Sequence, residues 1–157
     1  MSMLLGSDFI DADNSFNTSL KRNGADVFVK CYATSGAVAN TPMAVTYAGS
    51  CYNATVLIAS IYAYVGVPEG STSIASGGTG WVQIRGPVEG VQAGTTDSIG
   101  SIGHIVQWHT DCLCASSSTY LGDPTLGDVG MLTAEVSSVA TLDLYLTGLW
   151  ATPVAAG

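Results

Sequence analysis

The sequence predicts an all-β fold, either a small β-barrel or a β-sandwich, with an extended N-terminal arm. Three observations predict it. About seven or eight short segments rich in β-branched and aromatic residues recur at fairly regular spacing. Turns containing glycine or proline separate these segments, and neither an internal repeat nor a charged linker marks a second domain. The 157 residues therefore suit an arm over 1–24 and a single β domain over 25–157.

Residues 1–24 differ in composition from the rest of the chain. Their hydrophobic residues are scattered, and the turn signal Asn23-Gly24 ends the segment. A short helix capped at Ser7 and an extended arm are both compatible with this pattern. An extended arm would become ordered when it crosses a neighbouring subunit. We therefore expect three hydrophobic residues of the arm to contact a partner, namely Phe9, Phe16 and Leu20.

Strands are expected after the arm wherever apolar residues alternate with polar ones or form a short β-branched run. In the first strand, Val27, Val29 and Cys31 share one face. In the last, leucines at every second position from Leu142 alternate with more polar residues, which is typical of a half-buried strand. The expected ranges are 25–33, 43–47, 55–67, 81–85, 88–92, 99–109, 129–139 and 141–150. The last two of these strands are expected to pair with each other and close the fold.

The segment GWVQIRGPVEGVQ, residues 80–92, places one of the few basic residues of the chain in a strand that also carries a tryptophan. Every second residue from Trp81 to Arg85 is polar or aromatic, and the residues between them are apolar, so the strand has one face of each kind. Gly86-Pro87 is predicted to end this strand, because proline has no N–H for a ladder and glycine accepts unusual φ. The strand over 88–92 would then form the second half of a hairpin.

Two interpretations of the polar face of this strand stay open. Arg85 can pair with Glu89 across the predicted hairpin, and an exposed pair of this kind contributes only about 0–1 kcal/mol. Alternatively the face binds a partner, because tryptophan and arginine are enriched at interface hot spots. In the second interpretation the contact residues are Trp81, Gln83 and Arg85.

The composition limits the classes of function. Charged residues make up 10% of the chain, against about 25% in a typical protein, and 47% of residues are hydrophobic, with a mean hydropathy of +0.37. Because little charge is available to cover the surface, we expect other subunits to cover part of it. The net charge is −8 and the only strong cations are Lys21, Arg22, Lys30 and Arg85, which argues against nucleic acid and an anionic membrane as partners.

The start of the chain, MSMLLGSDF, lacks the basic and long apolar regions of a signal peptide. The longest apolar stretch, over 55–67, is too short to span a bilayer. We therefore expect the protein to be assembled in the cytoplasm. In that compartment free thiols are favoured over disulfides at Cys31, Cys51, Cys112 and Cys114, and an oxidant would allow two disulfides.

His109, Asp111, Cys112 and Cys114 lie within one short segment, but their spacing is not that of a structural zinc site. On a strand the first two would share one face and the two cysteines the other, so the four would not converge. No GxSxG elbow marks a nucleophile, and the glycine-rich SGGTGW at 76–81 lacks the lysine of a P-loop. We therefore expect no metal, no cofactor and no catalytic residue, and a protein that is not an enzyme.

Residues 65–94 resemble a segment of bacteriophage virion proteins, especially the small capsid decoration (cement) proteins. The residues that carry the resemblance are Val65-Gly66-Val67, Gly80-Trp81-Val82-Gln83, Gly86 and Ala93-Gly94. The stretch Thr95-Thr96-Asp97 departs from the pattern, because the family often has an aspartate directly after the glycine.

The resemblance implies a small β-barrel or β-sandwich that binds the outer surface of the capsid, often as a trimer, and locks neighbouring capsomers. The implied partners are the major capsid protein and further copies of the chain in a homotrimer, and the implied location is the virion. An acidic chain suits the outside of a shell better than the face that meets DNA. Two other functions stay open: a tail or fibre component that binds a host receptor or glycan, and a β-barrel hydrolase that uses His109 and Asp111.

Overall fold

The computed structural model describes residues 8–11, 19–46, 48–53, 63–93, 100–108, 113–115, 128–136 and 141–151. Across these residues the chain is almost entirely β: twelve strands belong to one hydrogen-bonded sheet, and the helical structure is confined to a 3-10 turn, η1 (Glu69–Ser71). The prediction of an all-β fold is confirmed. Within the same ranges no helix is both long and apolar enough to cross a membrane.

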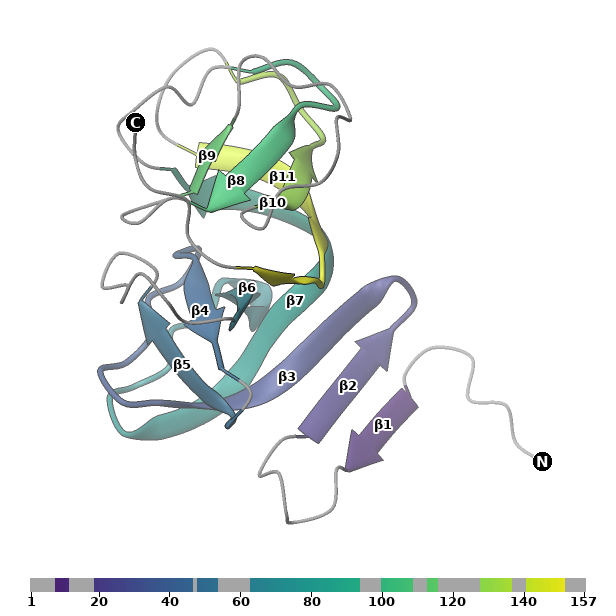
Figure 1. The fold of residues 1–157 in the computed structure, drawn as a ribbon. Coiled ribbons are helices and arrows are strands. Elements are labelled where there is room, and N and C mark those ends of the chain that lie inside the picture. The colour runs from purple at the N-terminus through teal and green to yellow at the C-terminus, as the bar shows by residue number, and fades with distance from the viewer. Residues whose placement is uncertain are drawn as a thin grey trace, which may run out of the picture.

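Five strands close into a barrel (Figure 1). In the order of pairing they are β3 (Asp26–Ala33), β5 (Ser50–Asn53), β4 (Met43–Val45), β6 (Ala63–Pro68) and β7 (Gly78–Gln92). β7 pairs with β6 along one edge and with β3 along the other, which closes the ring. The β3–β5 pairing is parallel, and the other pairings in the ring are antiparallel. Of the two predicted architectures, the barrel is the one found.

Inward-facing apolar side chains fill the barrel. Along β3, Val29 and Cys31 are buried as the alternation predicted, whereas Val27 is only half-buried. Ala33 is also buried, and Lys30 and Tyr32 are exposed. The remaining members of this core come from the other strands and from two connecting segments: Ala37, Met43, Val45, Cys51, Ile74, Val82 and Ile84. Removing these side chains from water is the main source of the barrel's stability.

A second group of strands continues from β7 and forms the other half of the molecule (Figure 1). In pairing order it contains β11 (Thr141–Thr147), β10 (Asp128–Leu132), β8 (Ile105–Trp108) and β9 (Leu113–Ala115), while β12 (Trp150–Ala151) pairs with β6. Leu142, Leu144 and Leu146 are fully buried on one face of β11, as predicted. They pack in a core that also contains Trp108 and reaches the barrel strands through Val65. The predicted closing pair is confirmed as the antiparallel β10–β11 pairing.

Several strands are shorter than the sequence pattern predicted. The strand expected over 99–109 is reduced to β8 because the chain turns just before it, where Gly103 has a φ of +87°. Of the strand expected over 129–139, β10 ends at Leu132 and Val136 forms an isolated bridge with Gly100, while residues 137–139 lie outside the described part of the chain. Of the strand expected over 55–67, residues 55–62 lie outside the described part of the chain and β6 contains the rest.

Gly86-Pro87 does not end a strand, so the predicted hairpin is wrong. β7 continues through both residues to Gln92, and its ribbon is bent along its length (Figure 1). Its pairing with β3 stops at Arg85, while its pairing with β11 extends from Arg85 to Gln92. Pro87 therefore has a neighbouring strand on one edge only, and a proline is tolerated where its missing N–H faces an unpaired edge. One bent strand serves both the barrel and the second group of strands.

Gly86 and Gln83 hold this bend. Gly86 has a φ of +104°, and a Cβ there would overlap Asp26 Oδ1 and lie 3.1 Å from Asp26 Cα. The amide nitrogen of Gln83 donates to Asp26 Oδ1 at 3.3 Å, to the Arg85 carbonyl at 3.2 Å and to the Pro87 carbonyl at 3.0 Å. A glycine suits this position beside Asp26, and the Gln83 amide supplies donors to two carbonyls at the bend.

The N-terminal segment is extended where it is described. β1 (Asp8–Asp11) and β2 (Ser19–Asn23) form an antiparallel pair, and β2 adds to β3 beyond the end of β5. The extended alternative is therefore the one found, and Ser7 itself lies outside the described residues. A tight turn at Gly24, with a φ of +60°, leads directly from β2 into β3. The expected boundary at residue 24 is thus the turn of a β-hairpin.

Candidate partner-binding face

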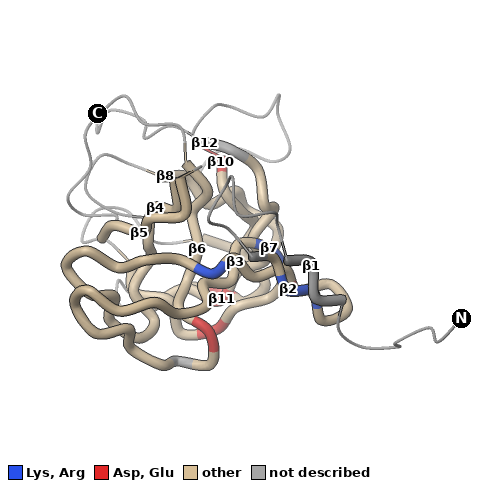
Figure 2. Tube along the Cα trace, turned by 90° about the horizontal axis from the view of Figure 1, so that it is seen from below, with Lys and Arg blue, Asp and Glu red and all other residues tan. Residues whose placement is uncertain are grey.

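All four basic residues of the chain lie on three neighbouring strands. β2 carries Lys21 and Arg22, β3 carries Lys30, and β7 carries Arg85. Since β3 pairs with both β2 and β7, these positive charges collect on one part of an acidic protein. Figure 2 shows this, with the blue segments confined to the β2, β3 and β7 region. Acidic residues lie beside them, because Asp8 is the register partner of Arg22 and Glu69 forms an ion pair with Lys21.

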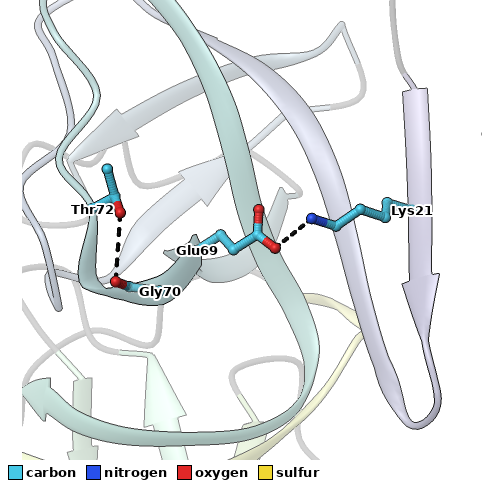
Figure 3. A network of polar contacts seen from close by, with 4 residues as sticks. All are labelled: Lys21, Glu69, Gly70 and Thr72. Carbon is cyan, nitrogen blue, oxygen red and sulfur yellow. Dashed lines mark hydrogen bonds and ion pairs between the residues drawn. The ribbon is translucent and has the colours of Figure 1, made fainter. Parts of the chain in front are cut away.

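Lys21 is the centre of a cluster that fastens β2 to the barrel. Its ammonium group forms an ion pair with Glu69, at the start of η1 (Figure 3). The same nitrogen lies 4.7 Å from the centroid of the Phe28 ring and 5.2 Å from that of Trp81. Ring faces attract cations, and the lysine stem covers apolar surface at the same time. Lys21 therefore acts within the fold, which explains why Phe28 is only 6% exposed.

We expect Lys21→Met to lower the free energy of unfolding by about 1–2 kcal/mol, because it removes the charge and keeps most of the apolar contact. Urea unfolding at low and high NaCl concentration would test this, since salt should weaken the parent and leave the variant almost unchanged. The matched control is Lys30→Met, because Lys30 is exposed and forms no ion pair with any residue that the structure describes. Equal effects of the two substitutions would contradict a structural role for Lys21.

The three predicted contact residues of β7 lie in different environments. Arg85 is exposed and Trp81 is half-buried, partly covered by the Lys21 ammonium. Gln83 is only 9% exposed, and its hydrogen bonds are all directed into the bend of β7. The prediction of an exposed Gln83 was wrong because a bulge shifts the register after Val27, so the alternation is interrupted. The predicted Arg85–Glu89 pair across a hairpin is excluded, because both residues lie on one continuous strand.

The predicted contact residues of the arm are only partly described. Leu20 is 36% exposed on β2. Phe9 is a backbone partner of Lys21 in the β1–β2 pair, and only its backbone is described. Phe16 lies outside the described residues. The backbone position of Phe9 places it on the strand next to the basic strand β2.

Two exposed tyrosines extend this region and were not singled out in the sequence. Tyr32 is 46% exposed on β3 and Tyr52 is 42% exposed on β5. Tyr32 is the register partner of Ser50, and Tyr52 lies two residues further along the same strand face. Lys30 precedes Tyr32 on this face and has Trp81 as its partner on β7. We call this surface the β3 outer face and define it by Lys30, Tyr32, Tyr52 and Trp81.

The sequence contained a signal for these tyrosines. In VFVKCY, residues 27–32, the inward residues Val27, Val29 and Cys31 imply that Lys30 and Tyr32 face outward. The identity of the strand beside Tyr32 was not readable, because β5 was not among the expected strands. Chemically, the β3 outer face offers flat aromatic rings and an ammonium group, a composition suited to a partner surface that is apolar in part and negatively charged.

The histidine and cysteine segment forms no site within the described residues. His109, Asp111 and Cys112 lie outside them, and only the backbone of Cys114 is described, as the register partner of Gln107 on β8. Among the side chains that are described, no group of three or more histidine, cysteine, aspartate or glutamate residues is placed to hold a metal ion. His104 is buried, and its Nδ1 accepts a hydrogen bond from the Ser101 N–H at 3.4 Å.

Comparison of the chain with protein-family models, with curated proteins and with solved structures gave no match in any of the three.

Proposed function

We propose that this chain is a non-enzymatic structural protein of a bacteriophage virion, which decorates the outer surface of the capsid and stabilises the contacts between capsomers. The observation that carries a binding role is the collection of every basic residue on β2, β3 and β7 beside the aromatic β3 outer face. The class of partner comes from the resemblance of residues 65–94 to capsid decoration proteins. The segment of that resemblance includes Trp81, a member of the face.

The mechanism that we propose is burial of aromatic and apolar surface against the major capsid protein. Tyrosine and tryptophan bury large areas at a small cost in conformational entropy, so a few of them dominate binding energies. Lys30 and Arg85 then pair with acidic groups of the partner and set its orientation. Further copies of the chain complete a homotrimer, either through exposed apolar residues or through the outermost strand β1, which can add to the sheet edge of a neighbour.

The proposal predicts that Trp81→Ala and Tyr32→Ala each weaken binding to purified empty capsid shells at least tenfold, as expected for hot-spot residues. Co-sedimentation with shells at increasing protein concentration measures the affinity. Ile102→Ala is the matched control, because Ile102 is 63% exposed and lies away from the β3 outer face, in the turn before β8. Tyr32 is a more informative position than Trp81. Its side chain is exposed, so replacing it should change the stability of the fold only slightly.

Light scattering of the parent chain, alone and with shells, gives the oligomeric state and the stoichiometry. Saturable binding that both variants lose and the control keeps supports decoration through this face. A folded parent chain that ignores shells contradicts the proposed function. Full binding by both variants contradicts the assignment of the face while leaving decoration through another surface intact.

A further inference from the structure

Two cysteines face each other inside the barrel. Cys31 on β3 and Cys51 on β5 are each 1% exposed and belong to the same buried cluster. Both are free thiols. The parallel register pairs Ala33 with Cys51, and Cys31 is the preceding inward residue on β3, so both side chains point into the same part of the interior.

The two thiols lie in one buried cluster and influence each other's protonation. A hydrogen bond between their side chains, together with burial, raises the pKa of Cys31, and the same bond lowers the pKa of Cys51. The Cys31 thiol also lies 3.5 Å from the Val29 carbonyl oxygen, which is a second acceptor for its proton. Cys51 is therefore the sulfur that gives up its proton first, and Cys31 remains beside it as a thiol.

We propose that Cys31 and Cys51 form an oxidation site, at which a peroxide converts the two thiols into a disulfide that joins β3 to β5. The inference does not depend on the proposed function. A disulfide requires Cα atoms within about 7 Å and side chains that converge. Both side chains point inward from adjacent strands and so meet the second condition, whereas Cys31 lies two residues before the register partner of Cys51, so closing the bond requires a shift of the backbone.

The reaction balances with hydrogen peroxide as the oxidant. The Cys51 thiolate attacks one peroxide oxygen, the O–O bond breaks, and the products are a sulfenic acid on Cys51 and hydroxide. Cys31 then loses its proton to that hydroxide, and its sulfur attacks the Cys51 sulfur. The S–O bond breaks and a second hydroxide leaves, which takes up a proton from solvent to become water. Two thiols have been oxidised by two electrons, and one peroxide has been reduced to two waters.

The position of the pair gives the bond a mechanical role. β3–β5 is the parallel pairing in the barrel, and it contains only the partners Tyr32–Ser50 and Ala33–Cys51. Parallel pairing is slightly less stable per residue than antiparallel pairing, so this short seam is one of the weaker closures of the ring. A disulfide across this seam would hold the barrel closed. It would also reduce the conformational entropy of the unfolded chain between the two cysteines.

The decisive experiment uses the full chain, treated with hydrogen peroxide and then alkylated under denaturing conditions without reduction. Trypsin has no site between Cys31 and Cys51, so a protease that cuts after aromatic residues, at Tyr32 and Tyr47, is needed to separate them. We expect a loss of two hydrogens from the intact mass and a cross-linked peptide pair containing Cys31 and Cys51. The melting temperature should rise by about 6–12 °C and return on addition of a reductant.

A second experiment excludes reactions of Cys112 and Cys114. It also tests the order of the steps with a variant that lacks Cys31. In a background of Cys112→Ser and Cys114→Ser, Cys31→Ala should leave Cys51 as a sulfenic acid that dimedone traps, whereas the background protein gives the disulfide and no adduct. Peroxide-treated protein in which both Cys31 and Cys51 are alkylated, or in which either is linked to Cys112, Cys114 or a second chain, would overturn the proposal.

Discussion

Gly86→Ala is expected to lower the free energy of unfolding by about 3–5 kcal/mol, the largest effect of any substitution that we propose in this chain. Two costs add. An alanine at a φ of +104° is strained, and its Cβ would overlap Asp26 Oδ1. The neighbouring Asp26 Cα, 3.1 Å away, belongs to the backbone of β3 and cannot rotate out of the way. Urea unfolding followed by far-ultraviolet circular dichroism measures the change.

Gly90→Ala is the matched control on the same strand. Gly90 also has a positive φ, of +65°, but no atom lies within 4 Å of the position that its Cβ would take. Gly90→Ala should therefore lower the free energy of unfolding only by the backbone strain, roughly 1–2 kcal/mol. Similar losses at the two positions would show that the contact with Asp26 is unimportant, and the account of the bend would fail.

Gln83→Leu is expected to lower the free energy of unfolding by about 2–4 kcal/mol. Leucine has a similar volume but cannot donate hydrogen bonds to the three acceptors that Gln83 now contacts. The Arg85 and Pro87 carbonyls and Asp26 Oδ1 would lose the donor that now lies 3.0–3.3 Å away. Leaving a buried polar group unpaired costs more than the hydrogen bond contributed. The same unfolding experiment gives the value.

Gln92→Leu serves as the comparison for Gln83. Gln92 is exposed at the end of β7, and its side chain accepts one hydrogen bond from the Thr41 hydroxyl at 3.3 Å. The expected loss is within about 1 kcal/mol. A Gln83→Leu protein as stable as Gln92→Leu would mean that the bend is held by Gly86 and packing alone.

The proposed binding face and the proposed oxidation site occupy opposite faces of the same two strands. On β3 and β5, Tyr32 and Tyr52 point outward next to Cys31 and Cys51, which point inward. A disulfide behind the face would hold the two tyrosines at a fixed spacing. The binding measurement is therefore best made on protein of known redox state, with reduced and oxidised samples compared.

The local alternation of residues predicted a good part of the fold. The buried leucines of β11 and the inward residues of β3 were readable because side chains in a strand alternate between faces, whatever the strand pairs with. The same rule explains the exposure of Tyr32, although it was not singled out. Lys21, in contrast, was expected in an arm, and its contact with Glu69 joins residues separated by 48 positions.

Gln83 and Gly86 mark the limit of such reasoning. Alternation placed Gln83 on an exposed face, and the glycine–proline pair predicted the end of a strand. Both expectations failed because β7 passes from one partner strand to another at this point, and because Asp26, 57 positions earlier, accepts a hydrogen bond from Gln83. A local pattern contains no information about which distant strand lies beside it.

The sequence by itself determined the all-β class, the inward and outward faces of its clearest strands, and an acidic surface with four cations. Only the tertiary structure decided that the ring closes through β3 and β7, that the cations collect on neighbouring strands, and that Cys31 and Cys51 share one buried cluster. The physical reason is that periodicity follows from the geometry of one strand, whereas pairing follows from the burial and hydrogen bonding of several strands together.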